Sequence, residues 1–494
     1  MLSQMFSNLS ASRIISRPNL KNISRIAASR LQHQLAEIKN EAPNYPPIID
    51  PSDEGQKRHQ RQLWYDSIKA MPTAEEKLYE LSVQQRVRST KHVIKDVPNI
   101  YTGIHFQNFI TRTHLEKDLP DKLKMINVDT ELSEIRDVLN EVLYNYYCNA
   151  FKHRSPKQLS DFLSEEEPGS SLAKSLIAQC SKKLAVRNEY IMNSTIQHQP
   201  RIDSFWWHAG YPSETEDVYE QNLCFQYKDF ASFVVRMKEP LSPILNLDHP
   251  LCATSEVPDY KYQPEVFDYD TTIRHISSVP GIWPGDEHQF PLILFNTTDK
   301  LKDLLSQIKY CDISKIEHSL GVTSSFGYLN AIATYQGFTP FHDLTYPLVA
   351  QSVLTNGQDW TFFVYQLNTI AFHSDVDQKD RRNICWSSKK MRLFDTIEDG
   401  QVKGINEEVY KVLLKFLLNA PIAKDGLNLR PYLGEDKREK EDAEHMRYFL
   451  RKMFSWAPEF DEHLLEVPTW EQIYKDHPEA PPSPYIKRSN ASWF

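Results

Sequence analysis

Two neighbouring apolar and aromatic runs form the clearest structural pattern in this chain. They span residues 349–355 and 358–367 and are separated by Asn356-Gly357. Asparagine and glycine tolerate the positive φ angles that a type I′ turn requires at both central positions, so the pattern predicts a β-hairpin. The second run carries large side chains at consecutive positions, which is typical of a strand buried on both faces. We therefore expect this hairpin at the centre of a sheet.

Apolar residues recur at helical spacing in three other segments, at 131–151, 172–186 and 406–418. The apolar stripe of the first segment consists of Leu132, Ile135, Leu139, Val142, Leu143 and Tyr146. Asn406 can cap the N-terminus of the third helix, and Pro421 follows its end. These segments predict amphipathic helices that pack one face against a core.

A region of short, proline-bounded strands begins at Phe205-Trp206-Trp207-His208 and extends to about residue 295. A strand, a helix, the hairpin and the helix at 406–418 follow it. This succession predicts an α+β fold, with a mixed or antiparallel sheet and packed helices. Trp206 and Trp207 could stack on bases, but aromatic pairs at the start of a strand more often anchor a core. We expect both in the core.

A chain of 494 residues is long enough for two or three domains, or for one large core with extensions. Residues 37–115 are expected to form an arm, extended and proline-rich at 40–55, and a basic helical segment at 56–95. The α+β core is expected at 116–421. A C-terminal helix and a proline-rich tail are expected at 422–494.

The first 36 residues are typical of a mitochondrial transit peptide. They contain no acid, and their basic residues are Arg13, Arg17, Lys21, Arg25 and Arg30. Four of these recur at every fourth position, opposite an apolar face, and such a basic amphipathic start is a mitochondrial import signature. We therefore expect a protein of the mitochondrial matrix. Apolar runs are far shorter than the roughly 18 residues of a membrane span, so no span is expected.

Several short motifs are similar to one known family in order and spacing. The densest group is Tyr365-Gln-Leu-Asn-Thr369, Asn383-Ile-Cys-Trp386, Thr396-Ile-Glu-Asp399 and Val402-Lys-Gly404. Further matches are Asn330-Ala-Ile-Ala333, Tyr335-Gln-Gly-Phe338 and Tyr45-Pro-Pro-Ile48. Together they resemble the mitochondrial ribosomal proteins also called programmed cell death protein 9, number thirty of the small-subunit naming series.

This resemblance implies a structural constituent of the mitochondrial large ribosomal subunit, despite the small-subunit name. It implies a role in mitochondrial translation, with no catalysis and no cofactor. The implied partners are other large-subunit proteins, the large-subunit rRNA, and a sister protein, number thirty-seven of the large-subunit series. Nothing is carried over to residues 422–494, because family members can end near residue 421.

The overall charge of the chain limits how extensively the protein can bind RNA. Lys and Arg number 57 against 66 Asp and Glu, which gives a net charge of −9. Removal of residues 1–36 would lower it to −14, because that segment holds five basic residues and no acid. Proteins that mainly wrap RNA are normally basic, since phosphate contacts supply the affinity. We therefore expect mostly protein partners and only local contact with rRNA.

Two local groups of basic residues are the candidate contacts with rRNA or an acidic partner. The first basic group surrounds Trp386, is opposed locally by Asp380 alone, and consists of Lys379, Arg381, Arg382, Lys389, Lys390 and Arg392. The second basic group, in the segment 56–95, contains Lys57, Arg58, Arg61, Arg86 and Arg88, interleaved with aromatic residues. Taken without the family, solvated faces are the simpler interpretation of both.

Patterns for catalysis or metal binding are weak. The six cysteines form no C-x-x-C pair, and no site for a cofactor or metal is expected. A calcium loop after His373 would need an oxygen ligand at 379 and glycine at 380, where the chain has Lys379 and Asp380.

The glycine-bounded residues 321–327 lack the Lys-Ser/Thr of a phosphate loop, so we interpret them as a turn. Cys385 is interpreted as a buried thiol rather than a nucleophile paired with His373.

Two alternatives to a structural ribosomal role remain open. One is a matrix enzyme that processes RNA with carboxylates near the hairpin, such as Asp343 and Asp359, although their spacing matches no known motif. The other is an assembly factor that leaves the finished particle.

Overall fold

The computed structural model describes residues 50–434, except 75, 78–87, 95–102, 147–167, 212–220, 260–262, 268, 270, 276–277, 283–285, 299–312, 377–379, 399–400 and 422–425. The expected transit peptide and proline-rich tail lie outside the described residues. The chain divides into two units, residues 1–61 and 62–494. In the first unit, the Ser52 hydroxyl accepts the N–H of Gly55 at 3.0 Å, at the start of helix α2 (Asp53–Ala70).

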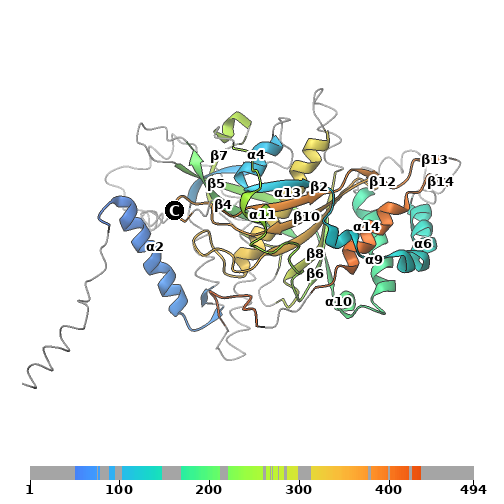
Figure 1. Cartoon of the computed structure of the whole chain (residues 1–494), viewed down its shortest axis with the longest axis horizontal. Helices are drawn as coiled ribbons and strands as arrows, with labels where there is room; N and C mark the ends of the chain where they lie inside the picture. The colour runs from blue at the N-terminus through green and yellow to red at the C-terminus, as the bar shows by residue number, and fades with distance from the viewer. Residues whose placement is uncertain are drawn as a thin grey trace, which may run out of the picture. The chain divides into compact units, whose positions relative to one another are not determined.

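The second unit is built on a large mixed sheet (Figure 1). Its path runs through β2 (Thr113–Lys117), β11 (Asn383–Ser387), β10 (Asp359–Leu367), β9 (Leu348–Thr355), β8 (Phe290–Thr297), β6 (Phe233–Met237) and β3 (Thr195–His198). β2 runs parallel to β11 and β8 parallel to β9, whereas the other pairs along the path are antiparallel. The predicted α+β class with a mixed sheet is confirmed.

A second sheet has the order β4 (Arg201–Tyr211), β5 (Gln221–Phe230), β1 (Arg88–Ile94) and β7 (Thr271–His275). Helix α13 (Ile313–Tyr335) packs against strands of both sheets, and α4 (Gly103–Ile110) packs against α13. Helices α6 (Asp129–Tyr144), α9 (Pro168–Leu184) and α14 (Glu407–Leu418) contribute buried residues to a separate core with the large sheet.

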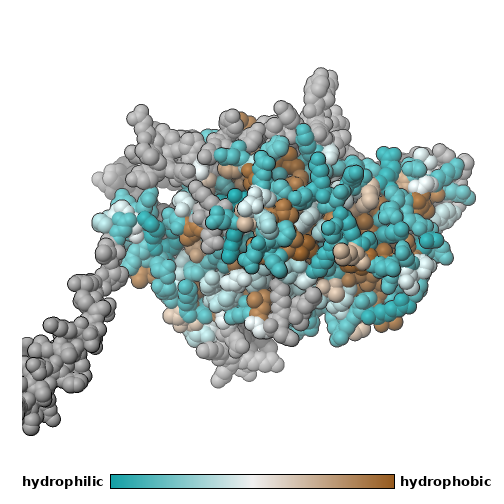
Figure 2. All heavy atoms as spheres, in the orientation of Figure 1, coloured by the Kyte–Doolittle hydropathy of each residue, from teal (hydrophilic) through white to brown (hydrophobic). Residues whose placement is uncertain are grey.

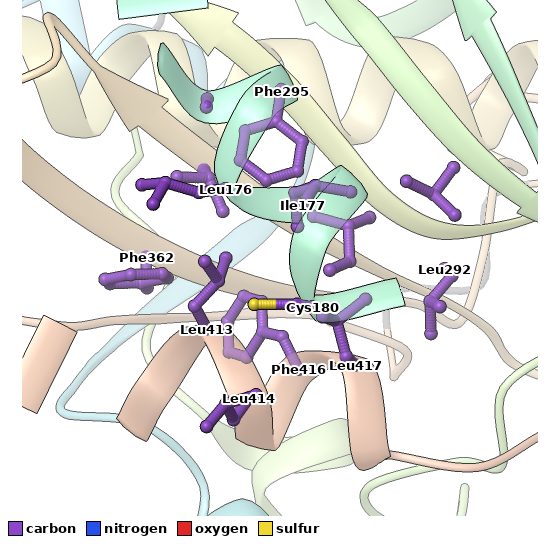
Figure 3. Close-up of a cluster of buried hydrophobic side chains, with 14 of the residues drawn as sticks. Leu176, Ile177, Cys180, Leu292, Phe295, Phe362, Leu413, Leu414, Phe416 and Leu417 are labelled. Carbon is purple, nitrogen blue, oxygen red and sulfur yellow. The ribbon is translucent and has the colours of Figure 1, made fainter. Parts of the chain in front are cut away.

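Strand β10 separates two hydrophobic cores. Trp360, Phe362 and Val364 belong to the first core, with the α6, α9 and α14 helices. Phe363 and Tyr365 belong to the second core, with α13 and the second sheet. Because successive side chains of a strand point to opposite faces, one apolar strand closes both cores. Figure 3 shows the first core, where Cys180, Phe295, Phe362 and leucines of α14 come together.

The hairpin and its buried second strand are confirmed, but the predicted type I′ turn is wrong. Thr355 pairs with Trp360, so the connection is longer than the Asn356-Gly357 dipeptide. Gly357 has φ of 91°, whereas Asn356 is not among the residues with positive φ. The Asn356 carboxamide oxygen instead accepts the N–H groups of Gln358 (3.0 Å) and Asp359 (2.7 Å). This side-chain bonding fixes the turn without a left-handed asparagine.

The three predicted helices are also present. They are α6, α9 and α14, and the end of the first prediction, at 147–151, lies outside the described residues. The Asn406 side chain accepts the N–H of Glu408 at 3.1 Å, as expected of a cap. Trp206 and Trp207 are buried, and the Trp206 indole donates to the Ile110 carbonyl at 2.9 Å.

The helical interpretation of residues 56–95 is only partly right. Helix α2 ends at Ala70, and residues 88–94 form strand β1. β1 lies between β5 and β7, pairing in parallel with the first and antiparallel with the second. Its β-branched residues suit a central strand, and ladder pairing outweighs a weak helical pattern. β1 and α4 both lie before residue 116, where we expected the core to begin, and both pack with core elements.

Residues 321–327 do not form a turn, because they lie within α13. A Cβ atom added to Gly321 would come within 2.5 Å of the Phe363 ring on the large sheet. One added to Gly327 would overlap the Tyr227 ring on the second sheet. These two glycines therefore let one helix approach a sheet on each side, which explains their place inside a helix despite the cost of glycine there.

The segment 426–434 packs against other parts of the second unit. Leu433 is fully buried, and its carbonyl accepts the Lys77 ammonium at 2.7 Å. Arg430 donates to the side-chain oxygens of Gln336 (2.9 Å) and Gln289 (2.8 Å). Gly337, with φ of 90°, leaves room for Leu433, because a Cβ there would lie 2.5 Å from the leucine Cγ. Among the described helices, none is long and apolar enough to cross a membrane.

We expect Gly321→Ala to destabilise the protein by about 1–3 kcal/mol, because the added methyl group overlaps the fully buried Phe363 ring. Lys315→Ala, at an exposed position of the same helix, is the matched control and should change the unfolding free energy little. Denaturant unfolding of the purified variants measures both. Equal stability of Gly321→Ala and the parent protein would show that the helix does not depend on this close approach.

Candidate nucleic-acid and partner interface

The first basic group does not form a single patch around Trp386. Arg381 and Arg382 precede β11, whereas Lys389, Lys390 and Arg392 follow it. At about 3.3 Å per residue, a five-residue strand separates its two ends by roughly 17 Å. Trp386 itself is only 6% exposed and belongs to the first core. Lys379 lies outside the described residues.

Arg381 and Arg382, which precede β11, form contacts with neighbouring segments of the chain. The Arg381 guanidinium donates to the Leu344 carbonyl at 3.3 Å and lies 3.7 Å from the Asp343 carboxylate. The backbone N–H of Arg382 donates to the Cys252 carbonyl at 2.7 Å. Both arginine side chains are half-buried. Their contacts serve the fold, which leaves only part of each guanidinium accessible to a partner.

Lys389, Lys390 and Arg392 follow the C-terminal end of β11, which we call its lysine end. Two of these cations are paired with acids from distant segments. The Lys390 ammonium lies 2.7 Å from Glu317 of α13 and 3.6 Å from Asp359 of β10. Arg392 lies 3.4 Å from the same Asp359. The expectation that Asp380 alone opposes the group is therefore wrong, because these acids come close only in the folded chain. Lys389 is exposed and the Arg392 side chain is 60% exposed, whereas the Lys390 side chain is 39% exposed and is held by two acids, so the first two are the more accessible cations here.

The second basic group is also divided by the fold. Lys57 and Arg58 are exposed on α2, where Arg58 lies 3.4 Å from Asp50. Arg61 is 6% exposed. Arg86 lies outside the described residues, and Arg88 begins strand β1 opposite His275.

The carboxylates considered for catalysis have separate structural partners. Asp343 accepts the Thr369 hydroxyl at 2.7 Å and the Ile370 N–H at 2.9 Å. Asp359 pairs with the lysine end of β11, as described above. Within the described ranges, no group of three or more His, Cys, Asp or Glu side chains could hold a metal ion.

Cys385 and His373 are both buried. Burial raises the pKa of the Cys385 thiol well above its ordinary value, which favours the neutral, unreactive form. His373 lies among aromatic rings, with the Phe341 ring centroid 4.9 Å away, and 3.8 Å from Asp375. The interpretation of Cys385 as a buried thiol is confirmed.

The family that the sequence motifs resemble is confirmed by comparison with known protein families. The model of the mitochondrial 28S ribosomal protein S30 (PDCD9) family matches residues 10–421, which is most of the chain. The chain belongs to this family. The protein is thus a mitochondrial ribosomal protein, located in the mitochondrion, with a structural role in the ribosome. The matched range includes every strand of both sheets and ends before the segment 426–434.

Sequence reasoning found the basic residues but missed the acids that face them. Glu317 lies 73 residues before Lys390 in the chain, and Asp359 lies 33 residues before Arg392. No local sequence pattern indicates ion pairs between residues so far apart in the chain. The only sequence signal was an acid inside the apolar pattern of a buried helix, since a charge there is nearly always paired.

We expect Lys390→Met to destabilise the protein by about 1–3 kcal/mol, because it leaves the Glu317 carboxylate, 7% exposed, without its charged partner. Lys389→Met, at the exposed neighbouring position, is the matched control. The double variant Lys390→Met/Glu317→Gln should recover part of the loss, since it removes the buried charge. Thermal unfolding of the parent protein, Lys390→Met, Glu317→Gln and the double variant gives the coupling, and independent effects of the two substitutions would contradict the pairing.

Proposed function

We propose that the protein is a constituent of the large subunit of the mitochondrial ribosome and supports translation as an architectural, non-catalytic component. The family description carries a small-subunit name, and the sequence resemblance set out above implies the large subunit. The observation that carries the architectural part is the combination of an acidic chain, of net charge −9, with ion pairs that join Arg381, Lys390 and Arg392 to acids of the folded chain. Such a surface favours protein neighbours over extensive RNA wrapping.

The proposed partners are large-subunit proteins, including the sister protein numbered thirty-seven in the large-subunit series, together with local rRNA. For rRNA, we assign the contact to the accessible cations, Lys389 and Arg392 at one end of β11 and Lys57 and Arg58 on α2. Each of these side chains can reach solvent. In this proposal the fold is supported by Arg381, Arg382 and Lys390. Their side chains are less available to bind a partner.

A role as an RNA-processing enzyme gains no support from the hairpin carboxylates, because Asp343 and Asp359 each hold separate structural contacts. An assembly factor differs from a constituent in stoichiometry. It would be present on immature particles and depleted from mature ones.

The subunit assignment predicts the sedimentation of the protein. Mitochondrial ribosomes are separated into subunits at low magnesium, and the fractions of a sucrose gradient are quantified by mass spectrometry. We expect one copy per large subunit, retained at high salt. Recovery with the small subunit would refute the assignment, and a substoichiometric amount in mature particles would favour the assembly factor.

The rRNA assignment predicts that ultraviolet irradiation of intact ribosomes joins a nucleotide to the peptide that contains Lys389. Lys389→Glu/Arg392→Gln should lower the yield of this adduct several-fold, because it removes the attraction to phosphate. Lys389→Arg/Arg392→Lys keeps both charges and is the control. If the charge-reducing variant gives the same adduct yield as the parent protein, these residues do not bind rRNA.

A further inference from the structure

Strand β3 ends the large sheet and is paired on one side only. It is antiparallel to β6, with Ile196 opposite Val235 and His198 opposite Phe233. In the part of the chain that the structure describes, no strand pairs with its other side. An edge strand of this kind presents backbone N–H and C=O groups that can pair with another extended chain.

The first core continues outward to this edge. Directly opposed residues of antiparallel strands share a face, so Ile196 lies on the same face as Val235, which belongs to the first core. Ile196 is 37% exposed, Met192 at the end of helix α10 (Glu189–Met192) is 63% exposed, and Val186, just after α9, is 85% exposed. Figure 2 shows hydrophobic residues at the surface over the helices that Figure 1 labels α9 and α14.

The opposite face of β3 is held by its own chain. The Gln197 side chain donates to the Gly281 carbonyl, and the His288 ring lies 2.6 Å from the Asn193 carbonyl. The first contact holds one face of β3 and the second holds the residue that follows α10, whereas none of the strands that the structure describes pairs with the outer edge of β3. The edge is therefore positioned before any partner arrives, which reduces the cost of ordering it on binding.

Basic residues lie close in the sequence to the exposed Val186. Lys182 and Lys183 are exposed in the last turn of α9, and Arg187 follows them. Arg187 lies 2.9 Å from Glu134, and Glu189 is the exposed acid of α10. On a chain of net charge −9, this local excess of positive charge complements an acidic partner.

We propose that the open edge of β3 accepts an extended segment of a neighbouring ribosomal protein by β-strand addition. The added strand places apolar side chains over Met192 and Ile196 and acidic side chains toward Lys182 and Lys183. The occupant is a polypeptide rather than RNA, because only another peptide backbone matches the ladder of an edge strand. The proposal rests on residence in the ribosome but not on the choice of subunit.

A photo-crosslinking residue at Met192 of the full-length chain tests the proposal in purified ribosomes. We expect a covalent adduct with one ribosomal protein, through a peptide that is apolar and acidic. The same residue at Met125, which is 81% exposed on another element, is the control for non-specific reaction. An adduct with rRNA, or a yield at Met192 no higher than at Met125, would overturn the proposal.

A second experiment tests whether substitutions at this edge weaken binding of the neighbouring protein. Met192→Asp/Ile196→Asp should lower the occupancy of the crosslinked neighbour in purified ribosomes several-fold, because both charges would face its apolar residues. Val266→Asp changes an apolar residue that is 60% exposed elsewhere and is the matched control. Unchanged occupancy of that neighbour would contradict strand addition. Absence of the parent protein from ribosomes would instead refute the proposed function.

Discussion

The close packing of α13 between the two sheets is the constraint on which this structure depends. The helix contacts β9 and β10 of the large sheet and β4 of the second sheet. Gly321 faces the Phe363 ring on one side, and Gly327 faces the Tyr227 ring on the other. Because protein interiors are close-packed, even one methyl group at either position must displace a buried ring. The two glycines therefore allow α13 to approach both sheets closely.

The polar residues of α13 make this packing specific. The Gln107 side-chain oxygen of α4 accepts the hydroxyls of Ser319 and Thr323, the latter at 2.6 Å. Asn330 donates to Ser204 of β4 at 2.7 Å. A buried polar group without a partner costs free energy, so a rotated or shifted helix would lose these bonds as well as its ring contacts. These bonds therefore favour one register of α13 against α4 and β4.

The fold also decides which charges of the chain are available to ribosomal neighbours. Several basic residues that look free in the sequence are used internally, for instance by Glu317 and Asp359. The segment 426–434 extends the folded unit past the range of the family match, with Leu433 buried and Arg430 bonded to two glutamines. The described part of this chain therefore presents a surface of mixed charge, and residues 426–434 are part of its fold.

The sequence by itself determined the features that depend on local patterns. Two apolar and aromatic runs separated by Asn356-Gly357 predicted the β9–β10 hairpin, a capping asparagine predicted the start of α14, and short motifs identified the family. Tertiary structure decided what depends on distant residues. It placed Gly321 inside a helix, made residues 88–94 a strand between β5 and β7, and paired Lys390 with an acid 73 residues away. Sequence periodicity reports the local backbone, whereas close approach, strand pairing and charge pairing are fixed only when the cores close.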